Sequence, residues 1–480
     1  MRRRSFAEFS VGDVLYFHRT FKSSEFEAFS ALSGDCNPLH HDEEYSKEAN
    51  FDRPIQPLHL TIAPFSAIAG MYFPGKPSLY LQQEVKALEP VCYDTELAYS
   101  ARISAINKQT RTLDLSILVL RDSDVVVQGR ILVQCREEEW DEDNSNLLGE
   151  TAIPATSRPR ACVTGASGAI GSAVARALVR DGYDVVLQCR TKNRRVEVIV
   201  KLADQLGVEA EVCLADLAQS KGLTQLVEHL RKPLDAIVHT ACPPLDAPLS
   251  ELMKVQFEAL VGLSQGALAG MLSKQRGRIV QVGSTAVLSH PPGWEAYVAA
   301  KSAADNFVAG LDRAYSRFGV RGLVLAPAAV KTEFSAEHLP DNLPRLLPEE
   351  VAESVCGLLS QTIPQSYTIM EVGGTRAGRW GFSSAPVERE SEIVPLHSNH
   401  VANESGDHID DKVDATVRRV FKLGEDADLS EAGLGLTPGW DSLGHIVLML
   451  ELETVFQTKL NPTSFEETHT LAGIRRLIGG

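Results

Sequence analysis

Aromatic residues, paired cysteines, long apolar runs and positive charge are all scarce in this sequence of 480 residues. Aromatic residues make up 6% and hydrophobic residues 44% of the chain, a globular composition that excludes wholesale disorder. No run approaches the roughly 18 apolar residues of a membrane-spanning helix. Lysine and arginine number 47 against 63 acidic residues, so the surface as a whole repels a phosphate backbone. We expect neither a membrane span nor a nucleic-acid partner.

The eight cysteines are spread along the chain without close pairs, mostly in apolar strand-like runs. They are typical of small buried hydrophobic residues in a reducing compartment, and they form neither a disulfide framework nor a metal site. The basic start, MRRRSFAEFS, is followed by no apolar stretch of the kind found in secretory signals. A cytoplasmic protein is the expectation.

Two segments have the composition of linkers, because they combine charge, proline and small polar residues without an apolar period. They are residues 136–159 and 378–406. At roughly 100–200 residues per domain the length suggests about three domains. The linkers leave three blocks, at residues 1–135, 160–377 and 407–480.

Each block has its own periodicity. In the first, an apolar stretch at 58–73 predicts a buried helix, and alternating patterns from Tyr80 onward, including 95–106, 113–120 and 125–134, predict antiparallel strands. This is an α+β pattern, with a sheet wrapped over one helix. The middle block alternates short Val/Ile/Leu runs with amphipathic helices, which predicts an α/β Rossmann domain with a doubly wound parallel sheet. The last block predicts a small α-helical bundle.

A glycine-rich turn follows the first strand of the middle block and opens a helix. Such a turn lets the backbone approach a pyrophosphate, which then gains from the positive helix N-terminus. The same pattern also occurs in tight turns without a ligand. The candidate cofactor-binding residues in this turn are Thr164, Gly165, Gly168, Ile170 and Gly171.

Ser284 follows a later strand, Tyr297 comes thirteen residues after it, and Lys301 follows four residues further on. The spacing of four places Tyr297 and Lys301 on one helix face. An adjacent ammonium stabilises a phenolate and lowers the tyrosine pKa, so that Tyr297 can act as an acid at neutral pH. Ser284 can then hydrogen-bond the developing oxyanion.

Together these residues resemble the short-chain dehydrogenase/reductase family, in particular its 3-oxoacyl carrier-protein reductases, over about residues 160–374. The resemblance adds Asp216 and Thr332 as cofactor-binding residues and gives Gln256 the place of a catalytic helix asparagine. It also shows departures, which include Cys242 in a position where the family has glycine and Ala328 in the family's Pro-Gly pair. A degenerate reductase kept for packing is the alternative.

Cofactor choice can be read at the end of the second strand. Arg190 stands where NAD-dependent enzymes commonly carry a carboxylate, and Lys192, Arg194 and Arg195 follow it. A cation there suits the 2′-phosphate of NADPH. The alternative is a solvated basic loop.

In the first block, Asp35 and His40 lie five residues apart across a turn containing Pro38. A carboxylate and an imidazole can move the C2 proton of a thioester and handle water at C3. The segment resembles the MaoC-like hot-dog family of (R)-specific enoyl thioester hydratases. In that family the backbone N–H of a glycine near the helix start polarises the thioester carbonyl, and Leu58 stands at that place here. The alternative is a structural turn in which Asp35 caps and His40 packs.

Ser442 lies in the string Gly-Trp-Asp-Ser-Leu-Gly, just before a helix pattern. Residues 407–480 contain 13 acidic and 7 basic residues. This acidic block resembles acyl carrier proteins, which implies 4′-phosphopantetheine on Ser442 and a phosphopantetheinyl transferase as partner. An ordinary helix N-cap is the alternative.

The resemblances imply a multifunctional enzyme of fatty acid or polyketide type. NADPH would reduce a 3-oxoacyl thioester to its (3R)-3-hydroxy form, and the first block would interconvert that product and the trans-2-enoyl thioester. Condensing enzymes would be separate partners, and a homo-oligomer is implied. Two alternatives stay open: a carrier and docking module with relic catalytic domains, and a reductase of free alcohols or sugars.

Overall fold

The chain folds into two compact units, Met1–Pro386 and Val387–Gly480, in a computed structural model. The structure describes residues 2–142, 151–154, 157–230, 232–340, 342–360, 369–372 and 406–421, together with scattered residues from 423 to 475. None of the helices in these described parts is long and apolar enough to cross a membrane.

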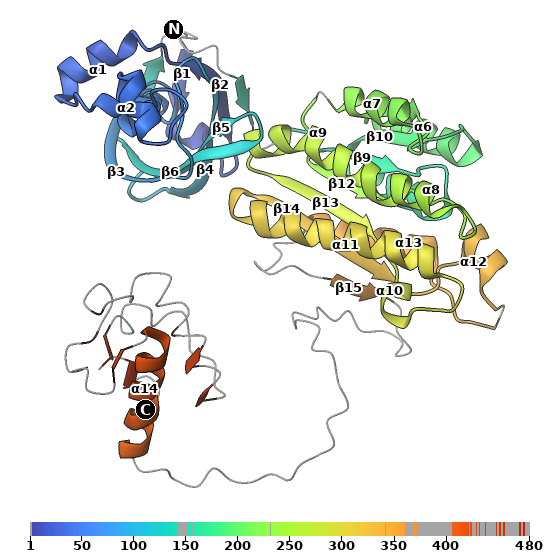
Figure 1. Cartoon of the computed structure of the whole chain (residues 1–480). Coiled ribbons are helices and arrows are strands. Elements are labelled where there is room, and N and C mark those ends of the chain that lie inside the picture. The colour runs from blue at the N-terminus through green and yellow to red at the C-terminus, as the bar shows by residue number, and fades with distance from the viewer. Residues whose placement is uncertain are drawn as a thin grey trace. The chain divides into compact units, whose positions relative to one another are not determined.

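The first unit begins with an antiparallel sheet that wraps around short helices (Figure 1). Six strands lie side by side in the order β3 (Ser78–Ala87), β6 (Asp124–Cys135), β5 (Thr112–Arg121), β4 (Glu96–Asn107), β2 (Val14–Thr20) and β8 (Thr151–Ile153). Strands β4, β5 and β6 coincide with the three alternating patterns. Their inward residues join one buried apolar cluster, so the predicted α+β hot-dog-like domain is confirmed.

The apolar stretch at 58–73 lies inside this sheet, but it is not one continuous helix. It consists of three turns, α3 (Leu58–Thr61), α4 (Pro64–Ala67) and the π-helical η3 (Ile68–Tyr72). The break precedes Pro64, which lacks the N–H that a continuous helix needs. Phe65 packs so closely on β6 that a Cβ at Gly129 would lie 2.5 Å from its ring.

The segment 136–159, which the composition marks as a linker, contributes two strands to this domain. Strand β7 (Glu139–Glu142) pairs antiparallel with β1 (Arg2–Ser5), and β8 pairs with β2. The reason is Trp140, which is buried and stacks on Phe9 with ring centroids 6.3 Å apart. The buried indole of Trp140 thus packs this otherwise polar stretch onto the core of the domain.

The second part of the unit is a seven-stranded parallel sheet, as predicted for a Rossmann domain. Its strands lie in the order β11 (Ala210–Leu214), β10 (Asp184–Cys189), β9 (Arg160–Thr164), β12 (Ala236–His239), β13 (Gly277–Val282), β14 (Val320–Pro327) and β15 (Ile369–Val372). The strand order reverses between β9 and β12, and ligands bind at such a switch point in open α/β sheets.

Helices cover both faces of this parallel sheet, and Figure 1 shows α9 and α11 lying along one of them. One apolar cluster joins the strands to α5 (Ala169–Arg180), α6 (Arg194–Leu206) and α13 (Pro348–Ser360). Another joins them to α7 (Ser220–His229), α9 (Ala259–Ser273) and α11 (Glu295–Tyr315). This doubly wound arrangement leaves the carboxyl ends of the strands to build a site.

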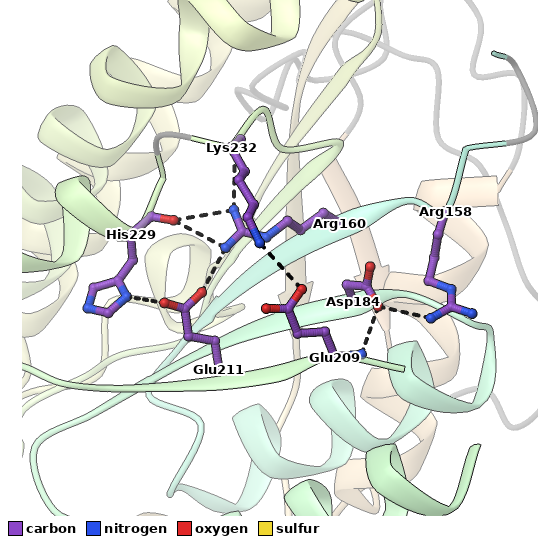
Figure 2. A network of polar contacts seen from close by, with 7 residues as sticks. All are labelled: Arg158, Arg160, Asp184, Glu209, Glu211, His229 and Lys232. Carbon is purple, nitrogen blue, oxygen red and sulfur yellow. Dashed lines mark hydrogen bonds and ion pairs between the residues drawn. The ribbon is translucent and has the colours of Figure 1, made fainter. Parts of the chain in front are cut away.

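A charged network closes the amino ends of the strands (Figure 2). Arg160 pairs with Glu211 at 2.9 Å and donates to the backbone carbonyl of His229, and the His229 imidazole lies 2.5 Å from Glu211. Burial would raise the pKa of Glu211, but its bonds with His229 and Arg160 lower it overall. Because these charges satisfy one another, we interpret the network as structural.

The hot-dog-like sheet and the parallel sheet share polar contacts within this unit. The Gln275 side chain donates to the carbonyl oxygens of Ser100 and Ser116 at 3.0 and 2.9 Å, and the Ser100 hydroxyl donates to Ser273 at 2.8 Å. All of these bonds involve buried groups, where an unpaired polar atom is costly.

In the second unit the structure describes α14 (Gly406–Phe421) and parts of the segment after it. Val413 and Val417 of this helix join an apolar cluster with Leu448 and Leu452. Arg419 pairs with Glu451 at 2.7 Å. The predicted helical bundle as a whole, and the predicted linker at 378–406, lie largely outside the described residues.

Candidate active sites

The glycine turn between β9 and α5 is built for a close backbone approach. Gly165 has a φ of +66°, in the left-handed region that favours glycine. A Cβ at Gly171 would lie 2.3 Å from the carbonyl oxygen of Gly165, so no larger residue fits there. Helix α5 begins at Ala169, so its positive N-terminus faces the turn. These are the features that a pyrophosphate requires.

A cavity of about 360 Å³ opens at the carboxyl ends of the strands, beside this turn. Most of the predicted cofactor and catalytic residues line it: Gly165, Gly168, Ile170, Gly171, Arg190, Asp216, Tyr297, Lys301 and Thr332. Thr164, Ser284 and Gln256 are not among the lining residues. The size and the mixed polar and apolar lining are ordinary for a small-molecule site.

Tyr297 and Lys301 lie on α11, one turn apart, as their spacing predicts. The Lys301 ammonium donates a hydrogen bond to the carbonyl oxygen of Val282 at 2.8 Å and lies 6.0 Å from the centre of the Tyr297 ring. The prediction of a lowered Tyr297 pKa is wrong for this structure, in which the Tyr297 pKa is raised overall. Burial raises the pKa of Tyr297, and Cys242 raises it further.

Two aromatic neighbours bury the Tyr297 ring, and one polar neighbour opposes the effect of burial on its pKa. Trp294 and Phe334 pack on the Tyr297 ring, with centroids 5.5 and 5.8 Å away, and remove it from water. A hydrogen bond from Ser284 acts in the opposite direction and lowers the Tyr297 pKa. Ser284 follows β13 and also accepts a hydrogen bond from the Ala286 N–H at 3.2 Å. Ser284 is therefore the group that can stabilise negative charge on the phenolic oxygen.

His239, at the end of β12, fixes the backbone behind the cavity. Its Nδ1 lies 2.9 Å from the Thr164 hydroxyl, and its Nε2 lies 3.0 Å from the carbonyl oxygen of Val255. A carbonyl only accepts, so Nε2 carries the proton and Nδ1 accepts from Thr164. Burial, and then the charge of Lys301, lowers the pKa of His239 to about 3. Thr164 thus positions the backbone and does not line the cavity.

Gln256 lies on a π-helical turn, η4 (Lys254–Glu258), between α8 (Leu249–Met253) and α9. Its amide nitrogen donates to the Cys242 sulfur at 3.3 Å, whereas its Oε1 is buried and has no partner among the described residues. The only described partner of the Gln256 side chain is therefore Cys242. Gln256 is positioned to orient the Cys242 thiol.

The basic residues after β10 have different partners. Arg195 pairs with Glu333 and donates to the carbonyl oxygen of Ser167. Arg190, by contrast, lines the cavity, is exposed and has no ion-pair partner among the described residues. Arg190 is thus the guanidinium available to an anionic ligand in this cavity.

Gln188 is a functional residue that the sequence reasoning missed. Its side-chain oxygen accepts from the Gly165 N–H at 2.8 Å, and its amide donates to the carbonyl oxygen of Ala215 at 2.7 Å. It therefore holds the glycine turn and the end of β11 together. The available signal was a polar residue inside the apolar run DVVLQC.

In the hot-dog-like domain, Asp35 follows α1 (Glu25–Ser33), and His40 ends the short helix η2 (Pro38–His40). The His40 Nδ1 lies 2.8 Å from the carbonyl oxygen of Ile55, so this nitrogen carries the proton. The other nitrogen, Nε2, lies 3.7 Å from the Asp35 carboxylate. The structure therefore brings the predicted pair together and leaves His40 Nε2 able to act as a base.

The remaining predictions concern Leu58 and Ser442. Leu58 is the first residue of α3, where helix N–H groups have no intrahelical acceptor. Its N–H is thus compatible with the predicted polarising role. Ser442 lies outside the described residues, so its attachment of phosphopantetheine stays a prediction.

Comparisons with known proteins agree with this geometry. Residues 159–342 match the short chain dehydrogenase family, and residues 9–118 match the MaoC like domain. The chain belongs to the short-chain dehydrogenase family of oxidoreductases and carries a MaoC-like domain as well.

Two curated relatives illustrate the reductase match. The uncharacterized oxidoreductase YmfI of Bacillus subtilis (strain 168) is 31% identical over 220 residues, which are 42% of this chain and 91% of that protein. An uncharacterized oxidoreductase of Staphylococcus saprophyticus is 27% identical over 223 residues, which are 44% of this chain and 94% of that protein.

Solved structures include a short-chain dehydrogenase from Sphingobium yanoikuyae in complex with NADPH, with 24% identity and a TM-score of 0.40 over 44% of this chain and 87% of that one. An alcohol dehydrogenase from the archaeon Thermococcus sibiricus, complexed with 5-hydroxy-NADP, has 25% identity and a TM-score of 0.40 over 45% of this chain and 96% of that one.

Proposed function

We propose that this protein processes acyl thioesters at C3, using two catalytic domains in succession. The reductase domain would reduce a 3-oxoacyl thioester to the (3R)-3-hydroxyacyl thioester, and the MaoC-like domain would reversibly dehydrate that product to the trans-2-enoyl thioester. The observation that carries the proposal is the presence, in one compact unit, of a cavity lined by Tyr297 and Lys301 and of the Asp35/His40 pair. The product of the first chemistry is the substrate of the second.

In the reduction, Tyr297 would donate its phenolic proton to the carbonyl oxygen as C3 is reduced. The raised pKa of Tyr297 keeps this proton in place until the oxygen becomes basic. Ser284 would hold the same oxygen while negative charge develops. Ser284 would also stabilise the phenolate that remains, and Lys301 would hold the end of β13 in place through its hydrogen bond to the Val282 carbonyl oxygen.

The residues fit NADPH as cofactor. The cradle formed by Gly165 and Gly171 admits a pyrophosphate and no side chain, and Arg190 supplies a cation for the 2′-phosphate. Asp216 and Thr332 line the same cavity. When bound, NADPH supplies the hydride for C3.

In the dehydration, His40 Nε2 would remove the C2 proton, and Asp35 would assist the departure of the C3 hydroxyl as water. The C2 proton taken by His40 would be passed to the departing C3 hydroxyl, through Asp35 or directly, so that water leaves, a C2–C3 double bond forms and the pair returns to its starting protonation state. The Leu58 N–H would polarise the thioester carbonyl and stabilise the enolate-like charge.

The C-terminal unit would carry the acyl group on 4′-phosphopantetheine attached to Ser442 by a phosphopantetheinyl transferase. Tethering raises the local substrate concentration to about the millimolar range for short flexible links. Co-expression with a promiscuous transferase should add the mass of one phosphopantetheine, and Ser442→Ala should remove it. An unmodified wild-type chain with several transferases would leave Ser442 as a helix cap.

The central test supplies a 3-oxoacyl thioester and NADPH to the full chain and follows the oxidation of NADPH. Tyr297→Phe should abolish oxidation, and Asp35→Asn should keep it but stop formation of the enoyl product. Absence of oxidation with every chain length would overturn the reductase proposal and favour the carrier and docking alternative. Equal rates with free ketones or sugars would favour a reductase of non-thioester substrates.

A further inference from the structure

The hydroxyl group of Tyr93 is a buried polar group that the proposed mechanism does not use. Tyr93 is 5% exposed and packs in the core of the hot-dog-like domain. Its hydroxyl has no hydrogen-bond partner among the described residues. Burial of an unpaired hydroxyl is costly, so native proteins rarely keep one without a reason.

Tyr93 lies next to a residue that pairs with the backbone orienting His40. Its neighbour Cys92 forms an antiparallel bridge with Ile55, the residue whose carbonyl oxygen accepts the His40 hydrogen bond. The Gln56 side chain donates to the Cys92 carbonyl oxygen at 2.9 Å and secures this contact. Tyr93 is therefore tied through two residues to the backbone that orients His40.

The Asp35 carboxylate also acts on Tyr93. Burial, and then the negative charge of Asp35, raises the pKa of Tyr93 to about 12. The phenol thus stays protonated and offers a neutral O–H donor in the field of the Asp/His pair. A protonated donor suits an oxygen that gains negative charge during a reaction.

We propose that Tyr93 is a substrate-binding residue of the MaoC-like domain, whose O–H donates a hydrogen bond to an oxygen atom of the acyl thioester held at Asp35 and His40. This inference rests on the proposed dehydratase function and adds a third polar side chain to its site. The substrate oxygen would supply the partner that the Tyr93 hydroxyl lacks within the protein. Tyr93 would thereby restrict the site to acyl groups that present an oxygen at this place.

The test is Tyr93→Phe in the full chain, with three measurements. The kcat/KM for dehydration of a 3-hydroxyacyl thioester should fall about 10- to 100-fold, as expected for a lost hydrogen bond to a polar or charged group. The thermal unfolding midpoint should stay the same or rise, because the variant removes an unpaired buried hydroxyl. Reduction of a 3-oxoacyl thioester should be unchanged, which shows that the chain is folded.

Tyr99→Phe is the matched control, because Tyr99 is a fully buried tyrosine of the same core whose hydroxyl donates to the Thr61 carbonyl oxygen at 2.6 Å. This variant should lower the unfolding midpoint and retain dehydration. An unchanged kcat/KM for dehydration in Tyr93→Phe, whatever its unfolding midpoint, would mean that Tyr93 only packs in the core and would overturn the inference.

The two proposals fail in different ways. If the wild-type chain and Asp35→Asn both lack dehydration of every thioester tested, the dehydratase function itself is wrong. If the wild type is active, Asp35→Asn is inactive and Tyr93→Phe equals the wild type, only the role of Tyr93 is wrong.

Discussion

The imidazole of His239 donates a hydrogen bond from Nε2 to the carbonyl oxygen of Val255, at 3.0 Å. This contact joins the end of β12 to the π-helical turn that carries Gln256. The second ring nitrogen of His239, Nδ1, accepts a hydrogen bond from the Thr164 hydroxyl, at the end of β9. One neutral side chain therefore holds three elements around the cofactor cavity, and protonation of Nδ1 would break the Thr164 contact.

This arrangement predicts a stability loss in acid. The ordinary histidine pKa is about 6.5, whereas burial and Lys301 lower that of His239 to about 3. Between these values the unfolded chain binds a proton that the folded chain excludes, so stability is full above pH 6.5 and falls toward pH 3. At about 1.4 kcal/mol per pKa unit the loss is on the order of a few kcal/mol.

The check is chemical denaturation of wild type and His239→Asn between pH 4 and 8. The difference between their unfolding free energies should shrink as the pH falls. Asp305 acts in the opposite direction. Burial raises its pKa to about 6, so its contribution to stability is lost as the pH rises toward 6. Subtracting the two curves cancels Asp305, and a difference independent of pH would contradict the role assigned to His239.

The glycine turn makes a second prediction. Gly171→Ala should abolish or greatly weaken NADPH binding, because its Cβ would lie 2.3 Å from the Gly165 carbonyl oxygen. Gly310→Ala on α11 is the control, since no atom lies within 4 Å of the added Cβ. That helix substitution should stabilise the protein by roughly 0.5–1 kcal/mol. Fluorescence titration measures the NADPH affinity of each variant. Equal affinity in Gly171→Ala and Gly310→Ala would contradict the proposed cradle.

Cofactor preference should depend on Arg190. We expect Arg190→Ser to raise the KM for NADPH about 10- to 100-fold, the effect of losing a charge-assisted hydrogen bond, with little change for NADH. Arg195→Ser is a comparison variant, because Arg195 is already paired with Glu333. Steady-state kinetics with both cofactors would show the split. A similar rise in KM for NADH and NADPH would mean that Arg190 does not bind the 2′-phosphate.

Cys242 should be a site of inhibition by thiol reagents. It lines the cofactor cavity and contacts Gln256, so N-ethylmaleimide on its sulfur would occupy cofactor space. Burial raises the pKa of Cys242 and Lys301 opposes this, so modification should be slow at neutral pH and accelerate as the pH rises. NADPH should protect, and Cys242→Ala should resist inactivation. Inactivation of that variant at the wild-type rate would point to another cysteine.

Much of the fold follows from periodicity alone. Strands β4, β5 and β6 match their alternating patterns because one face of each is buried, and the parallel strands match their continuous apolar runs because both faces are. Pro64 indicates a break in the stretch 58–73, but the continuous hydrophobicity of this stretch favours a single helix. Strand β7 was missed because its pairing depends on Trp140 meeting Phe9, a contact between distant parts of the chain.

The candidate sites were predictable to a lesser degree. Spacing and motif placed Tyr297 with Lys301 and Asp35 with His40. The direction of the Tyr297 pKa shift was not predictable, because it depends on how aromatic side chains from elsewhere in the chain bury the ring. Gln188, His239 and Tyr93 act through contacts to distant backbone groups or charges, and sequence spacing carries no record of such contacts.

The pairing of β7 and β8 determines where this protein can be divided. Strand β8 covers the edge of β2, and β7 binds the first residues of the chain. A fragment ending at residue 135 would lose both strands, leaving β2 with unpaired backbone groups and Phe9 without Trp140. Open strand edges template association between chains. A soluble hot-dog fragment therefore has to extend past Ile153, and shorter fragments should aggregate whatever their catalytic residues.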